Sequence, residues 1–137
     1  MQNILNALVA QSDWAILTLR IVLGVIFLAH GVRKAKSFSA VAGWFGGIGL
    51  KPGAFWAGLA MAAELLGGFF ILIGFWTAPA ALALAIVMVV AAITNLRAKK
   101  SFFQFLELDL ILLASLLLLA TLGSGFFSLN NLLGINL

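Results

Sequence analysis

The sequence of 137 residues contains no cysteine and only one histidine. Without cysteine, the chain forms no disulfide, carries out no thiol redox chemistry and offers no ligands to an iron–sulfur cluster or a cysteine-bound zinc ion. One histidine cannot build a histidine-rich metal site. Motifs typical of haem attachment and flavin binding are also missing. We therefore expect no metal site, and any redox work requires a non-covalently bound cofactor or a lipid-soluble substrate.

Charged residues are scarce as well, at 9% of the chain, whereas 64% of the residues are hydrophobic. A soluble domain carries roughly a quarter charged residues, so here the apolar residues must face lipid. The net charge of +4 would indicate nucleic acid in a soluble protein. The basic residues, however, lie in two short clusters between apolar runs, a pattern that sets membrane orientation. We expect the lipid bilayer as a partner and exclude nucleic acid.

Four apolar segments predict four transmembrane helices, at about residues 14–30, 54–76, 79–96 and 106–122. About 20 residues cross the hydrocarbon core, so the long apolar run from 54 to 96 is two helices. Pro79 suits the first turn of the second of these, which makes them antiparallel neighbours. The predicted fold is all-α, an integral membrane four-helix bundle that forms a single domain over residues 1–137.

The distribution of Lys and Arg predicts the orientation of this bundle. Seven of them lie in the two loops that follow the first and third spans, and none lies in the N-terminal segment, the central turn or the C-terminal tail. The positive-inside rule then places both loops in the cytoplasm and both termini outside. Trp14 and Trp76 mark the outer interface, and Trp56 marks the inner one. The N-terminal run lacks a basic start and a cleavage site, so we expect a retained anchor.

Between the first two spans, Phe38, Val41 and Phe45 recur at helical spacing. This pattern is typical of a short amphipathic helix on the membrane surface. An irregular loop under the bundle is the alternative.

Arg20 and Glu64 are the ionisable residues inside predicted spans, where each costs about 2.5–3.5 kcal/mol on insertion and needs a partner. Counted from Trp14 and Trp76, at 1.5 Å per residue, Arg20 lies about 9 Å deep and Glu64 about 18 Å deep. A long arginine side chain can largely close that gap. The depths predict an Arg20–Glu64 contact within the bundle.

Further polar residues follow toward the inner side. His30 lies roughly 6 Å below Glu64, and Lys34 follows His30 by one helical turn. Asn95, Glu107 and Asp109 lie at the inner ends of their spans. We expect Glu64 and His30 to be the catalytic, proton-exchanging residues, and a ligand to be bound by four others: Arg20, Lys34, Asn95 and Glu107.

Each assignment has a structural alternative. In this alternative, Arg20 and Glu64 form an ion pair whose role is only to fix helix register, and His30 caps a helix end. Lys34 and Glu107 then simply mark the headgroup boundary. Small residues pose a similar choice, because Gly67 and Gly68 on the second span and glycines on the first favour close helix packing. The alternative for the glycines is a slot for a flat ring.

The order of these segments resembles the DoxX family of small four-helix bacterial membrane proteins. The resemblance rests on residues 19–24 with Phe27, on His30-Gly31-Val32-Arg33-Lys34, on residues 64–68, and on the tail glycines Gly123 and Gly125. The chain departs from the family pattern at Asn95, where a histidine is common. It also departs at Phe126, Phe127 and Asn130, where Arg, Tyr and Asp are common.

The resemblance implies a location in the bacterial cytoplasmic (inner) membrane and quinone- or thiol-linked redox work there, usually with partner proteins. Relatives include the membrane subunit of a thiosulfate:quinone oxidoreductase. Our first hypothesis is a membrane subunit that binds a quinone or quinone-like aromatic non-covalently and works with a partner oxidoreductase. The alternatives are a non-enzymatic scaffold or assembly factor and, ranked last, a small transporter that works as a homo-oligomer. Whether the chain is itself an enzyme stays open at this point.

Overall fold

The protein is all-α in the computed structural model, which describes residues 1–98 and 106–135. The fold-class prediction is therefore confirmed for the described part of the chain. The helices there are α1 (Gln2–Lys36), α2 (Phe38–Gly47), α3 (Gly53–Ile73), α4 (Thr77–Arg97), α5 (Glu107–Leu122) and α6 (Leu129–Leu132).

Within those residues, three helical stretches are long and apolar enough to cross a membrane: Gln11–Lys36 of α1, Gly53–Ile73 and Thr77–Arg97. The chain is therefore a multi-pass membrane protein whose outer helix faces contact lipid. The sequence predicted four spans, and α5 stands where the fourth was expected. With 16 residues, α5 is shorter than the other three.

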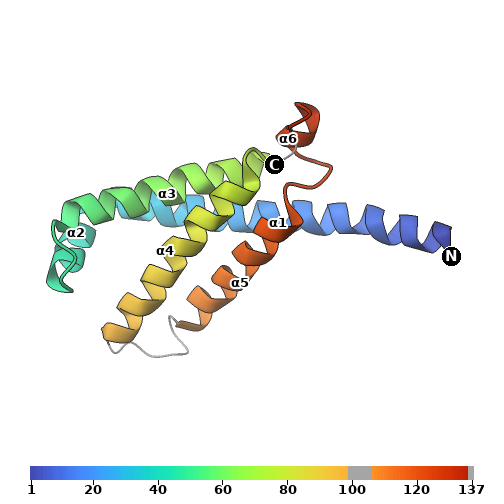
Figure 1. Ribbon diagram of the computed structural model, residues 1–137. Coiled ribbons are helices and arrows are strands. Elements are labelled where there is room, and N and C mark those ends of the chain that lie inside the picture. Colours follow the sequence, from blue (N-terminus) through green and yellow to red (C-terminus); the bar gives the residue numbers. More distant parts are fainter. Residues whose placement is uncertain (99–105, 136–137) are drawn as a thin grey trace.

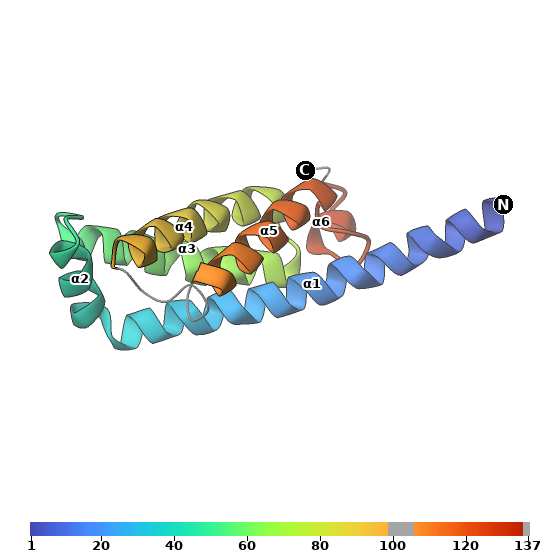
Figure 2. The same ribbon diagram turned by 90° about the horizontal axis from the view of Figure 1, so that it is seen from below.

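The long helices form one bundle (Figure 1). α1 packs along α3, and α5 packs along α4. The N-terminal part of α1 projects beyond the other helices in both ribbon views (Figures 1 and 2). α3 ends at Ile73 and is followed by Gly74, which has the left-handed conformation (φ 71°), and α4 begins three residues after Gly74. Pro79 lies in the first turn of α4, as predicted.

Glycines allow α1 and α3 to approach closely. A Cβ atom at Gly24 would lie 2.9 Å from Leu72 Cβ and 3.0 Å from the Gly68 carbonyl oxygen. At Gly68 it would lie 3.0 Å from the backbone nitrogen of Leu28. A side chain at either position would therefore separate the helices, which confirms the predicted packing role of the small residues. On the other face of α3, a Cβ atom at Gly67 would lie 2.9 Å from Leu84 Cγ of α4, so α4 also packs closely on a glycine of α3.

The centre of the bundle is apolar and draws on all four long helices. Its fully or almost fully buried side chains are Leu23, Phe27, Ile71, Leu84, Leu116 and Leu119. Through this core α5 packs mainly on α4 and to a smaller extent on α1.

The predicted helix between the first two spans is present as α2, and it crosses the end of the bundle next to α3 (Figure 2). Phe45 is its buried residue, at 7% exposed. A Cβ at Gly53 would lie 2.0 Å from the carbonyl oxygen of Ala42, so the start of α3 lies directly against α2. The lipid-surface location of α2 stays a prediction.

Candidate functional site

Lys34 and Glu64 form an ion pair between α1 and α3. Lys34 Nζ bonds to Glu64 Oε1. The Glu64 side chain is completely buried, whereas that of Lys34 is 25% exposed. The second carboxylate oxygen, Oε2, is also buried and has no hydrogen-bond partner among the described residues. A buried acceptor without a partner is costly, so this oxygen marks a position where a proton or a donor group would be stabilised.

Two further polar groups lie close to this pair. His30, half-buried one turn before Lys34, experiences the charges of Glu64, Lys34 and Asp109. Asn95 on α4 donates a hydrogen bond from Nδ2 to Asp109 Oδ2 on α5, at 2.6 Å. All four long helices therefore contribute a polar side chain to the same end of the bundle.

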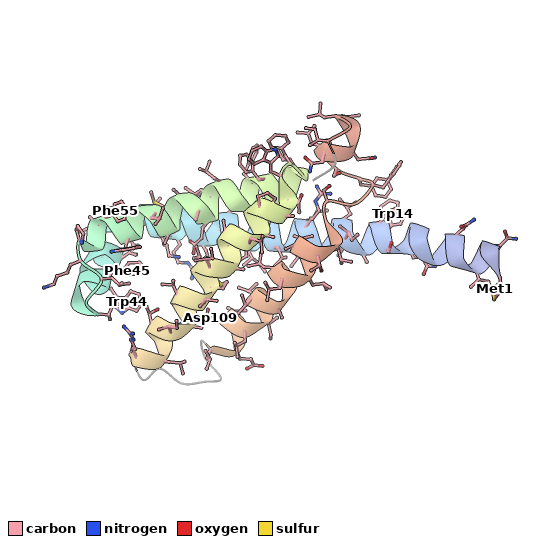
Figure 3. All side chains as sticks on the ribbon, in the orientation of Figure 1. Met1, Trp14, Trp44, Phe45, Phe55 and Asp109 are labelled. Carbon is pink, nitrogen blue, oxygen red and sulfur yellow. The ribbon has the colours of Figure 1, made fainter. Side chains whose placement is uncertain are left out.

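A cavity of about 800 Å³ opens beside the ion pair. Its polar lining comes from Lys34, Thr94 and Asn95 together with two tryptophans, and the rest is aliphatic or aromatic. α2 supplies Trp44 and Phe45 to the lining, and α3 supplies Trp56. Figure 3 shows Trp44 and Phe45 at the α2 end of the molecule, far from Trp14.

Arg20 lies outside this group, and its predicted contact with Glu64 is not formed. The guanidinium donates instead to four backbone carbonyls: Nε to Ile71, Nη2 to Leu72, and Nη1 to Ser124 and Phe127, at 2.6–3.0 Å. The Arg20 side chain is 2% exposed. These carbonyls belong to the last turn of α3 and to the C-terminal tail, so Arg20 fastens the tail to the bundle.

Arg20 and Glu64 do not meet because α1 is shifted along α3 relative to the predicted alignment. The depth estimate assumed that Trp14 and Trp76 lie in one plane. The glycine contacts set a different alignment, in which Gly24 faces Leu72 and Gly31 faces Leu65. In that alignment Arg20 is level with the end of α3, and Lys34 is level with Glu64.

The tail completes the end of the bundle that holds Arg20. The Asn130 backbone N–H donates to the Gly74 carbonyl, and Asn130 Oδ1 accepts from the Trp76 N–H. Asp13 Oδ1 accepts from the Phe126 N–H at 3.0 Å. Trp14 packs on Phe127, with ring centroids 4.6 Å apart. These contacts hold the tail beside the α3–α4 turn.

Of the six predicted site residues, the structure joins Lys34 and Glu64 in an ion pair, places His30 one helical turn before Lys34, and gives Asn95 a place in the cavity lining that it shares with Lys34. Arg20 lies at the other end, about 21 Å from Lys34 along α1, and Glu107 is exposed at the start of α5. Among the described residues, no three His, Cys, Asp or Glu side chains gather in a way that could hold a metal ion.

Sequence reasoning placed Asp109 at the inner side but gave it no role, and it did not find the aromatic lining. The available signal for Asp109 was its position in the first turn of the fourth predicted span, on the same side of the membrane as Asn95 near the end of the third. Trp44 and Phe45 sit in a segment whose helical periodicity was recognised, but the sequence does not show which neighbour they cover.

Comparison with known proteins gives one consistent result. Residues 15–96 match the model of the family described as DoxX. Over 114 residues the chain is 34% identical to a Bacillus subtilis (strain 168) protein named "Putative oxidoreductase CatD", and the alignment covers 83% of each chain. No solved structure matches the chain significantly. The family match includes α3 and almost all of α4, and so most of the cavity wall.

Proposed function

The chain belongs to the DoxX family, and we propose that it is the membrane subunit of a redox system that binds a quinone or quinone-like aromatic ring within its bundle. The observation that carries this proposal is the apolar cavity of about 800 Å³ whose few polar lining residues include Lys34, Thr94 and Asn95. Pockets for small organic ligands typically measure 300–1,000 Å³ and combine apolar walls with a few polar groups. The relative named as an oxidoreductase supports a redox role.

The polar groups of the site fit a quinone ring. Ring oxygens accept hydrogen bonds, and the Lys34 ammonium and the Asn95 amide are donors. Trp44 and Trp56 add aromatic faces to the lining, on which a flat ring packs favourably. The Glu64 oxygen that has no partner provides a place for a proton beside the ammonium.

Within this proposal, a bound quinone supplies two-electron, two-proton chemistry, and a partner oxidoreductase supplies or removes the electrons. Lys34 binds the ring oxygen. Glu64 holds Lys34 in place and exchanges a proton on its buried carboxylate. His30, which is half-buried one helical turn before Lys34, passes protons between the site and the end of the bundle. Arg20 is assigned a structural role, because its guanidinium donates its hydrogen bonds to backbone carbonyls.

We also propose that α5 is the fourth span. The tail that follows α5 is bonded to Gly74 and Trp76 at the α3–α4 turn. α5 therefore runs from the α2 end of the bundle to the turn end, antiparallel to α4. With the positive-inside rule, the α2 end is cytoplasmic and the tail is outside.

The test is to purify the protein from native membranes in mild detergent and to measure quinone in the extracted lipid. We expect about one quinone per chain, and we expect the Glu64→Gln variant to keep the bound ring but to lose turnover with the partner. If the extract contains no quinone above the membrane background, the redox proposal is wrong. Full partner turnover in Glu64→Gln, with an intact complex, would favour the scaffold alternative.

A further inference from the structure

The cavity is long, and its wall along α4 is polar at one end only. Along α4 its lining extends from Ala83 to Asn95, which is about 18 Å at 1.5 Å per residue. The polar members of this stretch, Thr94 and Asn95, lie at its end, and Lys34 of α1 also lines the cavity. The α4 wall from Ala83 to Ala91 is entirely aliphatic. A ring bound at Lys34 would occupy only part of this space.

The apolar part of the cavity is open at the side of the bundle. Leu59 on α3 and Ile86 on α4 both line it, yet they are 53% and 67% exposed. Both helices are candidate membrane spans, so these exposed faces meet acyl chains rather than water. In Figure 1, α4 diverges from α3 beyond the turn that joins them.

The end of the cavity near Asn95 is covered by α2. Trp44 and Phe45 form part of the lining there, and the close approach of Gly53 to the Ala42 carbonyl holds α2 against α3. A ligand dissolved in the membrane can therefore reach the cavity between α3 and α4 without passing α2.

We propose that the ligand is a membrane-dissolved quinone with a long hydrocarbon chain, whose ring lies at Lys34 and whose chain runs along Ala83 and Ile86 out between α3 and α4 into the bilayer. This inference rests on the proposed function and adds the class of ligand and its route of access. A small, water-soluble aromatic would leave the aliphatic part of the cavity unfilled.

The test uses the two tryptophans of the cavity as reporters, since quinones quench tryptophan fluorescence. The full-length protein with Trp14→Phe and Trp76→Phe, in lipid nanodiscs, keeps Trp44 and Trp56. It is titrated with a decyl-substituted benzoquinone and with the same ring that carries only a methyl group. Concentrations are expressed per lipid, so that partitioning into the membrane is removed from the comparison.

The decisive variant is Ala83→Phe, which fills the aliphatic part of the cavity, and its matched control is Ala114→Phe, at an exposed alanine of α5 that does not line it. We expect Ala83→Phe to weaken binding of the decyl compound about tenfold and to change binding of the methyl compound less than twofold. Ala114→Phe should change neither. Equal effects of Ala83→Phe on both compounds, or none on either, would overturn the inference while leaving the proposed function intact. If neither compound saturably quenches the tryptophan fluorescence of the protein that retains Ala83, the proposed function itself fails.

A second measurement does not depend on the stability of the Ala83 variant. A quinone with a photoreactive group at the chain end is cross-linked to the protein, with and without excess unlabelled decyl compound. We expect labelling that the competitor suppresses to fall on α3 and α4 residues of the opening, such as Leu59, Ile86 and Val90. Competitor-sensitive labelling confined to α2 would contradict the proposed route.

Discussion

Glu64 illustrates how burial sets the cost of a single charge. Its carboxylate has no access to lipid headgroups, whereas Lys34 is partly exposed and can extend toward the membrane surface. Removing one partner of a buried ion pair costs about 3–5 kcal/mol when the other charge stays buried and unpaired. The two halves of this pair should therefore respond differently to mutation.

We expect Lys34→Met to destabilise the protein by about 3 kcal/mol, the lower end of the range for a broken buried pair, and Glu64→Gln to destabilise it less. The reason is that methionine leaves a buried carboxylate without its cation, whereas the lysine released by Glu64→Gln reaches water. Reversible unfolding in mixed detergent micelles measures both. A greater loss for Glu64→Gln than for Lys34→Met would contradict this account of the pair.

At the scale of the helices, the α1–α3 interface decides which residues meet. The sequence predicted that glycines would allow these helices to pack closely, and the structure confirms it. Small residues in the sequence predict that two helices pack closely, but they do not determine how far one helix is shifted along the other. That shift separates Arg20 from Glu64 and joins Lys34 to Glu64, which is why the partner of Glu64 was predicted wrongly.

Gly24 and Gly43 give a matched pair of helix positions for testing this interface. Alanine at Gly24 would contact Leu72 and the Gly68 backbone, whereas a Cβ at Gly43 meets nothing within 4 Å. We expect Gly24→Ala to destabilise the protein by about 1–3 kcal/mol through overpacking. Gly43→Ala should instead be neutral or stabilising by up to about 1 kcal/mol, because alanine favours helix. Thermal unfolding of the two variants in the same detergent measures the difference, and equal shifts would refute the close α1–α3 contact.

At the scale of the whole molecule, much of the architecture follows from composition. Scarce charge and long apolar runs predict a helical membrane protein, and Pro79 places the tight turn. The polar residues at the α2 end were also found by their position near span ends. A ligand site was predicted, but the position and lining of the cavity were not, because they depend on how far α4 diverges from α3 and on where α2 packs. The role of Arg20 as a fastener of the tail was hidden for a related reason, since backbone carbonyls leave no signature in the sequence.

The orientation of the molecule is a prediction that single cysteines can test cleanly, because the chain has no cysteine of its own. Ser39 on α2 and Leu132 in α6 are both exposed and lie at opposite ends. We expect a membrane-impermeant maleimide added to intact cells to label Leu132→Cys but not Ser39→Cys. Lysis of the cells should make Ser39→Cys reactive as well. Labelling of Ser39→Cys alone in intact cells would reverse the proposed topology, and labelling of both would leave α5 without a crossing.

The most direct test of the central claim, that a quinone binds in the cavity beside Lys34 and Glu64, compares the tryptophans at the two ends of the molecule. One protein keeps only Trp44 and Trp56, and the other, with Trp44→Phe and Trp56→Phe, keeps only Trp14 and Trp76. Both are titrated with the decyl-substituted quinone in nanodiscs. The account predicts saturable quenching in the first protein, about tenfold weakened by Lys34→Met, and only linear, non-saturable quenching in the second. Saturable quenching at Trp14 and Trp76, or the same linear quenching in both proteins, would contradict it.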